Sequence, residues 1–433
     1  MNKMININEE KVFVLFFIII AAVDSLNGYL IRNIDFPFSV GQVYRGLLIL
    51  FLIHIIFKYK QFRIYPVLMG SFLVLQQFGY FAFVHQSLEG LMKDLIHLSK
   101  LLLIVLIIEA FMALKRKGSN SPLIEKVLYI NLIAFPLFIL IPKVFNTGYS
   151  MYSGNVGFSG FFYAANDLNV VLMVLFIFSS NSLITSIEIR NQKSILIYSL
   201  ITLGLLLSLL LLGSKSSVAF TGLTILIYLI VLYIKYKDKI TPKIYLYLLV
   251  GLLFICSALF LIFNDEIAKS IDRHSYFFQK QVQNENDLFS FIVTGRDTFL
   301  DAAIDDYNES EHKFFRFNFG IGNYSHGLGT AEHFFADKET MQIEMDFFDT
   351  FFSYGLLGTI LIYGYFILII LSNIKIGQRV GFPFYLSFCL VFLYSFLGGH
   401  VLYSALSGSF LALICAKITA KEYWLYLNKR PFF

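Results

Sequence analysis

The stretch EMDFFDTFFSYGLLGTILIYGYFILIIL, residues 344–371, marks the point where a hydrophilic part of the chain gives way to an apolar one. Glu344, Asp346 and Asp349 stand near its start, and no charged residue follows them before its end. An apolar run of this length can cross a hydrocarbon core about 30 Å thick, and it must do so as a helix because lipid offers the backbone no hydrogen-bond partners. The stretch therefore predicts a transmembrane helix over 345–371 that acidic side chains open.

The rest of the chain repeats this apolar pattern. Of its 433 residues, 57% are hydrophobic and 15% are charged, and the mean hydropathy is +0.70. Soluble proteins carry about 25% charged residues. The composition excludes a set of soluble domains and predicts an all-α polytopic protein that forms one integral membrane domain. We expect about 12 transmembrane helices, over 12–31, 40–57, 64–84, 88–114, 123–145, 164–187, 194–213, 216–234, 244–263, 345–371, 382–399 and 401–418.

The distribution of Lys and Arg among the short connections predicts the orientation of these helices. With the N-terminus in the cytoplasm, 20 Lys and Arg residues fall on the cytoplasmic side, whereas the short connections on the opposite side hold only Arg32, Lys143 and Lys215. Positive residues in short loops favour the cytoplasmic side. We therefore predict a multi-pass protein of the cytoplasmic (inner) membrane with both termini inside.

Residues 264–344 form one long hydrophilic connection, which this topology places outside, between the ninth and tenth spans. It has 15 acidic and 7 basic residues, a formal charge of −8. A loop of this length is usually functional or disordered. Order is indicated by apolar residues at helical spacing, at Phe299, Leu300, Ala303, Ile304 and Tyr307. We expect a large ordered extracytoplasmic loop that caps the outer face.

The patterns that hold metals, cofactors or nucleic acids in other proteins are missing from the sequence. The three cysteines lie inside apolar runs, which is typical of small buried side chains, at Cys256, Cys389 and Cys415. The chain has no nucleotide-binding loop, no cluster of metal ligands and no basic stretch interleaved with exposed aromatic residues. We therefore expect no metal, no cofactor and no nucleic-acid partner.

Charged residues inside predicted spans are informative because each costs roughly 2.5–3.5 kcal/mol to insert. Lys215 lies in the turn GSKSS, 213–217, on the side poor in positive charge, where a lone cation has no anchoring role. Beside free backbone N–H groups at a helix start, it suits an anion such as phosphate. Arg45 lies near an outer end, where anchoring and function both account for it. Asp167 opens the sixth span, and His400 separates the last two.

The fourth span carries four further polar residues. Lys93 and Asp94 lie near its outer end, where side chains that snorkel to the interface explain them better than function does. His97 and Lys100 lie deeper, and for them the two interpretations are equally good.

The outer loop contains a segment, TGRDTFLD, whose charges do not suit the start of a helix. Thr294 can cap this helix, which places Arg296 in its first turn, where a guanidinium opposes the helix dipole. That placement indicates an anionic ligand nearby. A stripe of acids follows, which a solvated helix face explains better than a metal site does, at Asp297, Asp301 and Asp305.

A second segment of the loop, FGIGNYSHGLG at 319–329, is a glycine-rich turn that contains Asn323, Tyr324 and His326. Without a strand before it and a helix after it, such a turn is only weak support for phosphate binding.

The third cluster is the acidic one that opens 344–371. Each of its members is an ordinary partner for a helix N-terminus. Together, and facing the same outer cavity as Arg296 and Lys215, the three acids Glu344, Asp346 and Asp349 indicate chemistry rather than capping alone.

In the order and membrane placement of these segments, the chain resembles the O-antigen polymerase and ligase superfamily of bacterial envelope enzymes (Wzy/WaaL type). The resemblance covers nearly the whole chain in topology, but its motifs are short. They are similar to the family's aromatic-Asn segment, small-Ser-Arg turn, Gly-Arg segment, Gly-x-Gly turn and His-Asn stretch, and to the end segment of Gram-positive polysaccharide polymerases: GFSGFFYAANDLN (157–169, with Asn166 and Asp167), GSKSS (213–217), TGRDTFLD (294–301), FGIGNY (319–324), EMDFFDTFFSYGLLG (344–358) and GGHVLYSALSGSF (398–410).

Two positions depart from the family's pattern. Lys215 replaces the usual Arg, and Glu344-Met345-Asp346 stands where the ligase branch has a His. The role of that His as proton acceptor is therefore not transferred to this chain, and the polymerase branch is favoured.

The resemblance implies a GT-C-like fold and a polysaccharide polymerase of the O-antigen or capsule type. Such an enzyme transfers a growing glycan from undecaprenyl diphosphate to a repeat unit on the same carrier, in the outer leaflet of the bilayer, with a chain-length regulator as a candidate partner. The alternatives are a ligase that moves the glycan to another acceptor and a flippase for the same lipid-linked oligosaccharide. The lack of related halves argues against the flippase.

The chemistry of this transfer assigns roles to the candidate residues. The donor leaves as a diphosphate, whose charge Arg296 and Lys215 stabilise, together with Arg45. Direct, metal-independent displacement inverts the anomeric centre and needs a proton acceptor, for which Glu344 or Asp346 is favoured over His326 or His400. Substrate-binding roles are expected at Asn166, Asp167, Asn323, His326 and His400.

Overall fold

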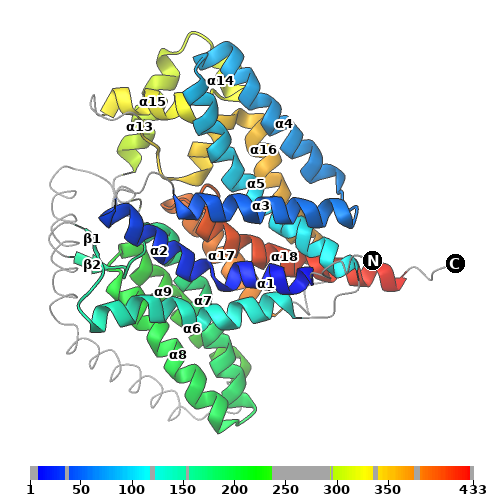
Figure 1. The fold of residues 1–433 in the computed structure, drawn as a ribbon, viewed down its shortest axis with the longest axis vertical. Helices are drawn as coiled ribbons and strands as arrows, with labels where there is room; N and C mark the ends of the chain where they lie inside the picture. Colours follow the sequence, from blue (N-terminus) through cyan, green and yellow to red (C-terminus); the bar gives the residue numbers. More distant parts are fainter. Residues whose placement is uncertain are drawn as a thin grey trace, which may run out of the picture. The chain divides into compact units, whose positions relative to one another are not determined.

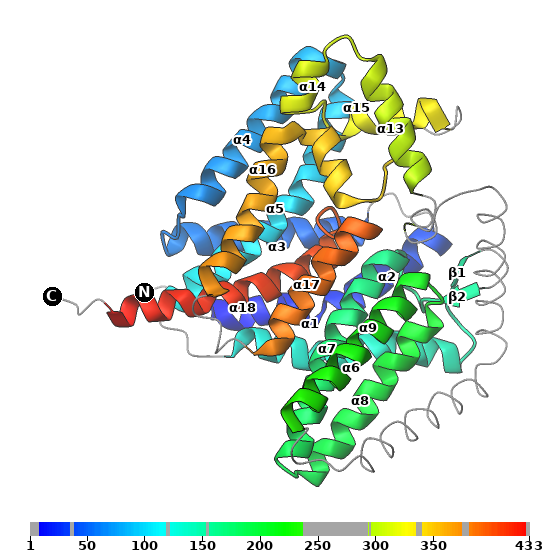
Figure 2. The same cartoon turned by 180° about the vertical axis from the view of Figure 1, so that it is seen from behind.

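In the computed structural model, the chain is described over residues 8–34, 39–117, 122–152, 156–236, 293, 296–334, 340–374 and 381–429 (Figures 1 and 2). It divides into two compact units. The first comprises Met1–Phe17, Gly41–Lys126 and Asn286–Phe433, and the second comprises Ile18–Val40 and Val127–Glu285. The predicted span 244–263 and Thr294, the predicted N-cap residue of a helix, lie outside the described residues.

A helix lies within every predicted span that the structure describes, but α17 ends at Leu397 and α18 begins at Ala405, so the residues between them form a turn instead of the predicted ends of two spans. Eight of the helices are long and apolar enough to cross a membrane, and α1 and α2, which meet at 44°, form a ninth candidate if the bent pair is one span. The two helices at 382–397 and 405–419 are shorter apolar segments. The mostly helical membrane fold is confirmed, and the full number of 12 spans stays a prediction.

The first unit is entirely helical over its described residues. Its elements are α1 (Glu9–Ile18), α3 (Val40–Lys58), α4 (Ile64–Tyr80), the π-helical turn η1 (Phe81–His85), α5 (Leu88–Arg116), α13 (Asp297–Glu309), α14 (Lys313–Phe319), α15 (Asn323–Phe334), α16 (Asp346–Ile374), α17 (Phe382–Leu397) and α18 (Ala405–Lys429).

The second unit combines helices with one small hairpin. It contains α2 (Ile20–Asn33), α6 (Leu123–Val144), β1 (Ser150–Tyr152), β2 (Val156–Phe158), α7 (Ala165–Glu188), α8 (Gln192–Leu211) and α9 (Lys215–Tyr236). The hairpin is antiparallel and is the one addition to the all-α prediction within the described residues. Helices α7, α8 and α9 pack on one another (Figure 2).

Helices α5 and α18 form the core of the first unit. Buried side chains cover most of the circumference of α5 from Leu98 onward, and α18 is buried over its first four turns. A helix that is apolar all round needs protein on all sides to be buried in this way. The close approach of the two helices uses Gly408, where a Cβ would lie 3.0 Å from the Ile104 side chain.

Helix α16 is broken inside its apolar run, at Gly355, whose φ is +67°. The break frees backbone carbonyls, and other segments satisfy them. The Ser353 carbonyl accepts the Gly322 N–H at 2.9 Å, and the Tyr354 carbonyl accepts the Gln76 amide at 3.2 Å. A Cβ on Gly355 would lie 2.4 Å from the backbone of Phe319. The glycine-rich turn after α14 therefore completes the broken helix.

Helices α13, α14 and α15 pack on the N-terminal half of α16, as Figures 1 and 2 show for this unit. Arg316 of α14, which is 8% exposed, donates to the Asp306 carboxylate at 2.5 Å and to its backbone carbonyl at 2.9 Å. The apolar face of α13 joins residues of the 343–352 segment in one core, of which Ala303, Met345 and Phe352 are members. The helix that the apolar spacing at 299–307 indicates is confirmed.

Carboxylates hold several of the cations that the sequence assigns to the cytoplasmic side. Glu109 of α5 accepts from Arg63 Nε at 2.8 Å and from the Tyr365 hydroxyl of α16 at 3.2 Å. Glu9 of α1 pairs with Lys58 of α3. These pairs join helices at their ends, where burying a charge without a partner would be costly.

Gly355→Ala tests the break in α16. The variant should lower the free energy of unfolding by about 2 kcal/mol or more, because alanine is strained at positive φ and its Cβ meets backbone that cannot yield. Gly79→Ala on α4 is the matched control: a Cβ there meets nothing within 4 Å. It should leave stability unchanged or raise it by up to about 1 kcal/mol, as helix propensity requires. Denaturant or thermal unfolding in detergent measures both, and equal stability of the two variants would contradict the prediction.

Candidate functional site

The N-terminus of α16 is organised by a buried carboxylate, Asp349. Its Oδ1 accepts the Ile343 N–H at 3.0 Å, and its Oδ2 accepts the Met345 N–H at 3.2 Å. These two amides flank Glu344, which has a φ of +62°, a left-handed conformation that costs a non-glycine residue about 1–3 kcal/mol. His326 Nε2 lies 3.4 Å from Asp349 Oδ1. Asp349 therefore fixes the turn that presents Glu344.

Glu344 and Arg296 form an ion pair at the surface of this turn. Arg296 Nη2 lies 2.9 Å from Glu344 Oε2, with the two side chains 13% and 42% exposed. Arg296 is the residue just before α13, one position earlier than the first helical turn in which the sequence places it. Its guanidinium lies against Gly398, where a Cβ would be 2.8 Å from Nη1. Its Nε is buried and has no hydrogen-bond partner among the described residues.

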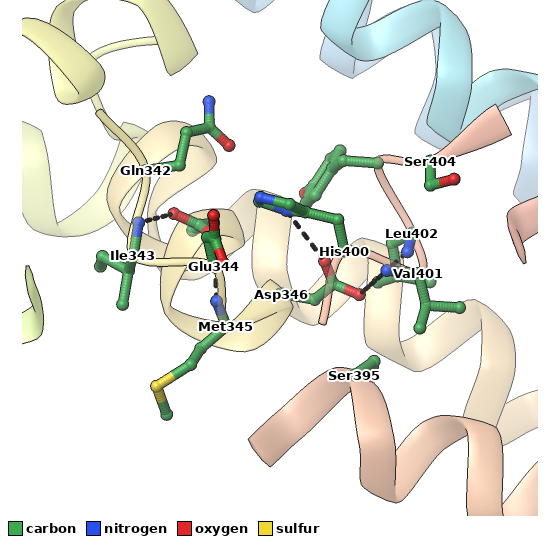
Figure 3. Close-up of polar contacts among 12 residues, drawn as sticks. Gln342, Ile343, Glu344, Met345, Asp346, Ser395, His400, Val401, Leu402 and Ser404 are labelled. Atoms are coloured by element: carbon green, nitrogen blue, oxygen red, sulfur yellow. Dashed lines mark hydrogen bonds and ion pairs between the residues drawn. The ribbon is translucent and has the colours of Figure 1, made fainter. Parts of the chain in front are cut away.

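A second carboxylate, Asp346, lies beside this pair and is fully buried. Its Oδ2 accepts the backbone N–H groups of Val401 at 2.8 Å and Leu402 at 2.9 Å. Its Oδ1 faces Nδ1 of His400 at 3.9 Å, and the His400 side chain is 26% exposed. Figure 3 shows the imidazole and the two backbone nitrogens on either side of the Asp346 carboxylate. Asp346 thus joins the start of α16 to the turn between α17 and α18.

Aromatic side chains pack beneath the turn that carries His400. The His97 ring of α5 stacks on Tyr403, with ring centroids 3.9 Å apart and planes at 22°. The Tyr403 hydroxyl lies 2.7 Å from that of Thr350 in α16. His97 is 5% exposed, so it does not snorkel to the interface, and a functional role for it stays a prediction.

The glycine-rich turn and its neighbours have structural contacts. His326 is fully buried and stacks on Phe352, with ring centroids 5.3 Å apart. The Asn323 side-chain oxygen accepts a hydrogen bond from the Gln342 amide. These contacts place His326 inside the cap core rather than at a surface that a substrate reaches.

Asp94 has a structural role that the sequence does not predict. It is fully buried, accepts the Tyr324 N–H at 2.7 Å and faces His85 Nε2 at 3.3 Å. The interpretation of Asp94 as a snorkelling side chain is therefore wrong, because the carboxylate caps the first turn of α15 instead. Lys93, which is part-exposed and pairs with Glu89 at 2.7 Å, fits that interpretation.

Three further candidates belong to the second unit, at the starts of α7 and α9. Asn166 and Asp167 lie in the first turn of α7 and are part-buried, as is Lys215, the first residue of α9. The two helix starts are joined by Asn169, whose amide donates to the Ser216 hydroxyl at 2.9 Å. The predicted convergence of Lys215 with Arg296 stays a prediction.

The remaining predictions concern Arg45, a metal site and the acids of α13. Arg45 lies in the second turn of α3 and is part-buried. No group of three or more His, Cys, Asp or Glu side chains suited to a metal ion occurs within the described residues. Asp301 and Asp305 are exposed on α13, as expected for the solvated face that the sequence favours.

The site combines chemical capacities that transfer reactions use. Arg296 supplies a cation with an unused buried donor, which suits an oxygen of an anion. Glu344 supplies a part-exposed carboxylate, and His400 an imidazole backed by a buried carboxylate. The sequence marks Asp349 as one of three acids but does not indicate its orienting role, because a carboxylate that accepts amides on both sides of a neighbouring residue has no signature in spacing. Nor does it indicate the role of Gly398, which ends α17 and leaves room for the guanidinium.

The segment that carries this cluster matches a known family. A search of curated proteins finds none that matches the chain. Residues 264–421, by contrast, match the family described as O-antigen ligase like membrane protein. This stretch contains Arg296, Glu344, Asp346 and His400, and the match confirms the resemblance that the sequence motifs indicate. Over these residues, the chain is similar to the family of O-antigen ligase like membrane proteins.

Proposed function

We propose that the protein is a membrane glycosyltransferase that polymerises cell-surface polysaccharide. It joins oligosaccharide repeat units carried on undecaprenyl diphosphate by inverting, metal-independent transfer at the outer face of the cytoplasmic membrane. One observation carries this proposal: within the segment that matches the family, a pair of Arg296 with Glu344 and a pair of Asp346 with His400 both lie at the start of α16.

Arg296 is suited to the leaving diphosphate. Cleavage of the bond between the anomeric carbon and the phosphate oxygen leaves negative charge on the diphosphate, and fixed donors that meet this charge lower the barrier. The guanidinium is 13% exposed, and its Nε–H is buried without a partner among the described residues. Glu344 is its resting counter-ion. An arriving diphosphate takes over that role and uses the unpaired donor.

The two carboxylates that the sequence favours as the base differ in how easily an acceptor hydroxyl can reach them. Asp346 has no exposed surface, and its Oδ2 already accepts two amides. It therefore does not meet an acceptor hydroxyl directly. Glu344 is 42% exposed, but Arg296 holds one of its oxygens. A proton acceptor must lie close to this pair, because the attacking hydroxyl and the leaving oxygen are bound to the same carbon in the transition state.

The polymerase is favoured over a ligase by the residues at the start of α16. The ligase branch has a His where this chain has Glu344-Met345-Asp346, so the proton acceptor of the ligases has no counterpart at that point. The distribution of Lys and Arg supports an orientation with both termini in the cytoplasm and with 264–344 outside. In this arrangement, Lys215, Arg45, Asn166, Asp167 and Asn323 are proposed to bind the substrates.

Purified protein in lipid vesicles should convert lipid-linked repeat units into longer lipid-linked glycans. The activity should persist in a chelator of divalent cations, because Arg296 and its neighbours supply the charge that a metal ion would otherwise provide. Gel separation of the glycans measures chain length. Transfer to a different acceptor without growth would identify a ligase, and translocation at constant length a flippase; either result would contradict the polymerase.

Two variants test the proposed diphosphate site. Arg296→Ala should lower transfer by about 100- to 1,000-fold, as loss of one fixed donor to a developing oxyanion does. Gly398→Ala should lower it as well, because the new Cβ lies 2.8 Å from Nη1 and displaces the guanidinium. Gly381→Ala is the control at the other end of α17, where the nearest atom to a Cβ is 3.4 Å away. Wild-type rates in Arg296→Ala would remove Arg296 from the mechanism.

A further inference from the structure

We propose that His400 is the proton acceptor of the reaction and that Asp346 is the residue that positions it. The inference rests on the proposed function and assigns the base that the chemistry requires. It departs from the sequence analysis, which favours Glu344 or Asp346 for this role and gives His400 as an alternative.

Asp346 is held firmly by the backbone of the turn after His400. One carboxylate oxygen accepts two consecutive backbone N–H groups, of Val401 and Leu402, at 2.8 and 2.9 Å. The carboxylate thus closes the turn that begins directly after His400. Since the side chain is fully buried, its other oxygen has a fixed direction, and that direction leads to the imidazole.

His400 is placed to use this carboxylate. Its Nδ1 is buried and has no hydrogen-bond partner among the described residues. This nitrogen faces Asp346 Oδ1, which lies 3.9 Å away. The side chain is 26% exposed, so Nε2 is the ring nitrogen left for a substrate. The negative charge of the Asp346 carboxylate, 3.9 Å from Nδ1, stabilises the imidazolium that forms when Nε2 takes a proton.

The base and the residue that binds the diphosphate then meet at one turn. The Arg296 guanidinium packs on Gly398, two residues before His400, and its partner Glu344 precedes Asp346 by two residues. A sugar whose phosphate oxygens contact Arg296 therefore has its anomeric carbon near the imidazole. Of the titratable groups described in this cluster, Glu344 and His400 combine exposure with proton-accepting capacity, and His400 is the one with a buried carboxylate behind its ring.

In the proposed transfer step, the acceptor hydroxyl oxygen forms a bond to the anomeric carbon as its proton moves to Nε2 of His400. The bond from that carbon to the phosphate oxygen breaks, and its electron pair leaves with the diphosphate, which Arg296 holds. The imidazolium faces Asp346, and it returns its proton to water or to the departing diphosphate before the next cycle.

The test compares variants that separate proton transfer from folding. His400→Asn should lower kcat by about 100-fold or more with little change in KM, as loss of a general base does. His400→Ala should lose the same activity and regain part of it when imidazole is added. Asp346→Asn keeps an oxygen for the Val401 and Leu402 N–H groups, so the turn should persist, while kcat falls by about tenfold or more at unchanged KM. Imidazole should not rescue this variant.

The control histidine is His333 on α15, whose Nε2 lies 3.7 Å from the exposed Glu309. His333→Asn should keep wild-type kinetics. Size-exclusion elution and thermal unfolding in detergent establish that each variant is folded. A folded His400→Asn variant with wild-type kcat, or a folded His400→Ala variant that imidazole does not restore, would overturn the inference. In both cases wild-type chain growth would leave the proposed function standing, whereas a wild-type protein that forms no glycosidic bond would remove that function itself.

Discussion

The arrangement depends on backbone hydrogen bonds inside an apolar helix. When α16 breaks at Gly355, the carbonyls before the break lose their helical donors, and in lipid each unsatisfied carbonyl costs several kcal/mol. The Gly322 N–H and the Gln76 amide supply those donors. Because Gly322 belongs to the turn between α14 and α15, the hydrogen bonds that satisfy the broken helix also hold this turn against α16. Helices α14 and α15 therefore pack with α16 as one unit.

The geometry of the site depends on the packing of α14 and α15 with the broken helix α16. The half of α16 before the break carries Asp346 and Asp349, and both carboxylates are used to hold backbone N–H groups of neighbouring turns. Asp349 fixes the turn of Glu344, and Asp346 fixes the turn of His400. Two part-exposed polar side chains are therefore backed by two buried carboxylates, which is how a site keeps its geometry.

Sequence reasoning recovers what depends on period and composition. The helices at the described span positions and the helix over 299–307 follow from apolar spacing, and the acids at 344–349 are marked by their place at a membrane entry. The roles of individual polar residues do not follow, because they depend on which distant segment supplies the partner. Asp94 illustrates this: it resembles a snorkelling side chain by position, yet it accepts the N–H of Tyr324, 230 residues away. The orienting role of Asp349 is hidden for the same reason.

The core shared by α13 and α16 also bears on how the protein can be divided. Ala303 of the cap packs with Ile343, Met345 and Phe352, and the last of these lies within the apolar run that opens at 345. An excised 264–344 fragment would keep one side of this core and leave its apolar surface in water. Helix α13 therefore shares its core with α16, and antibodies or ligands raised against such a fragment would meet surfaces that the intact protein keeps covered.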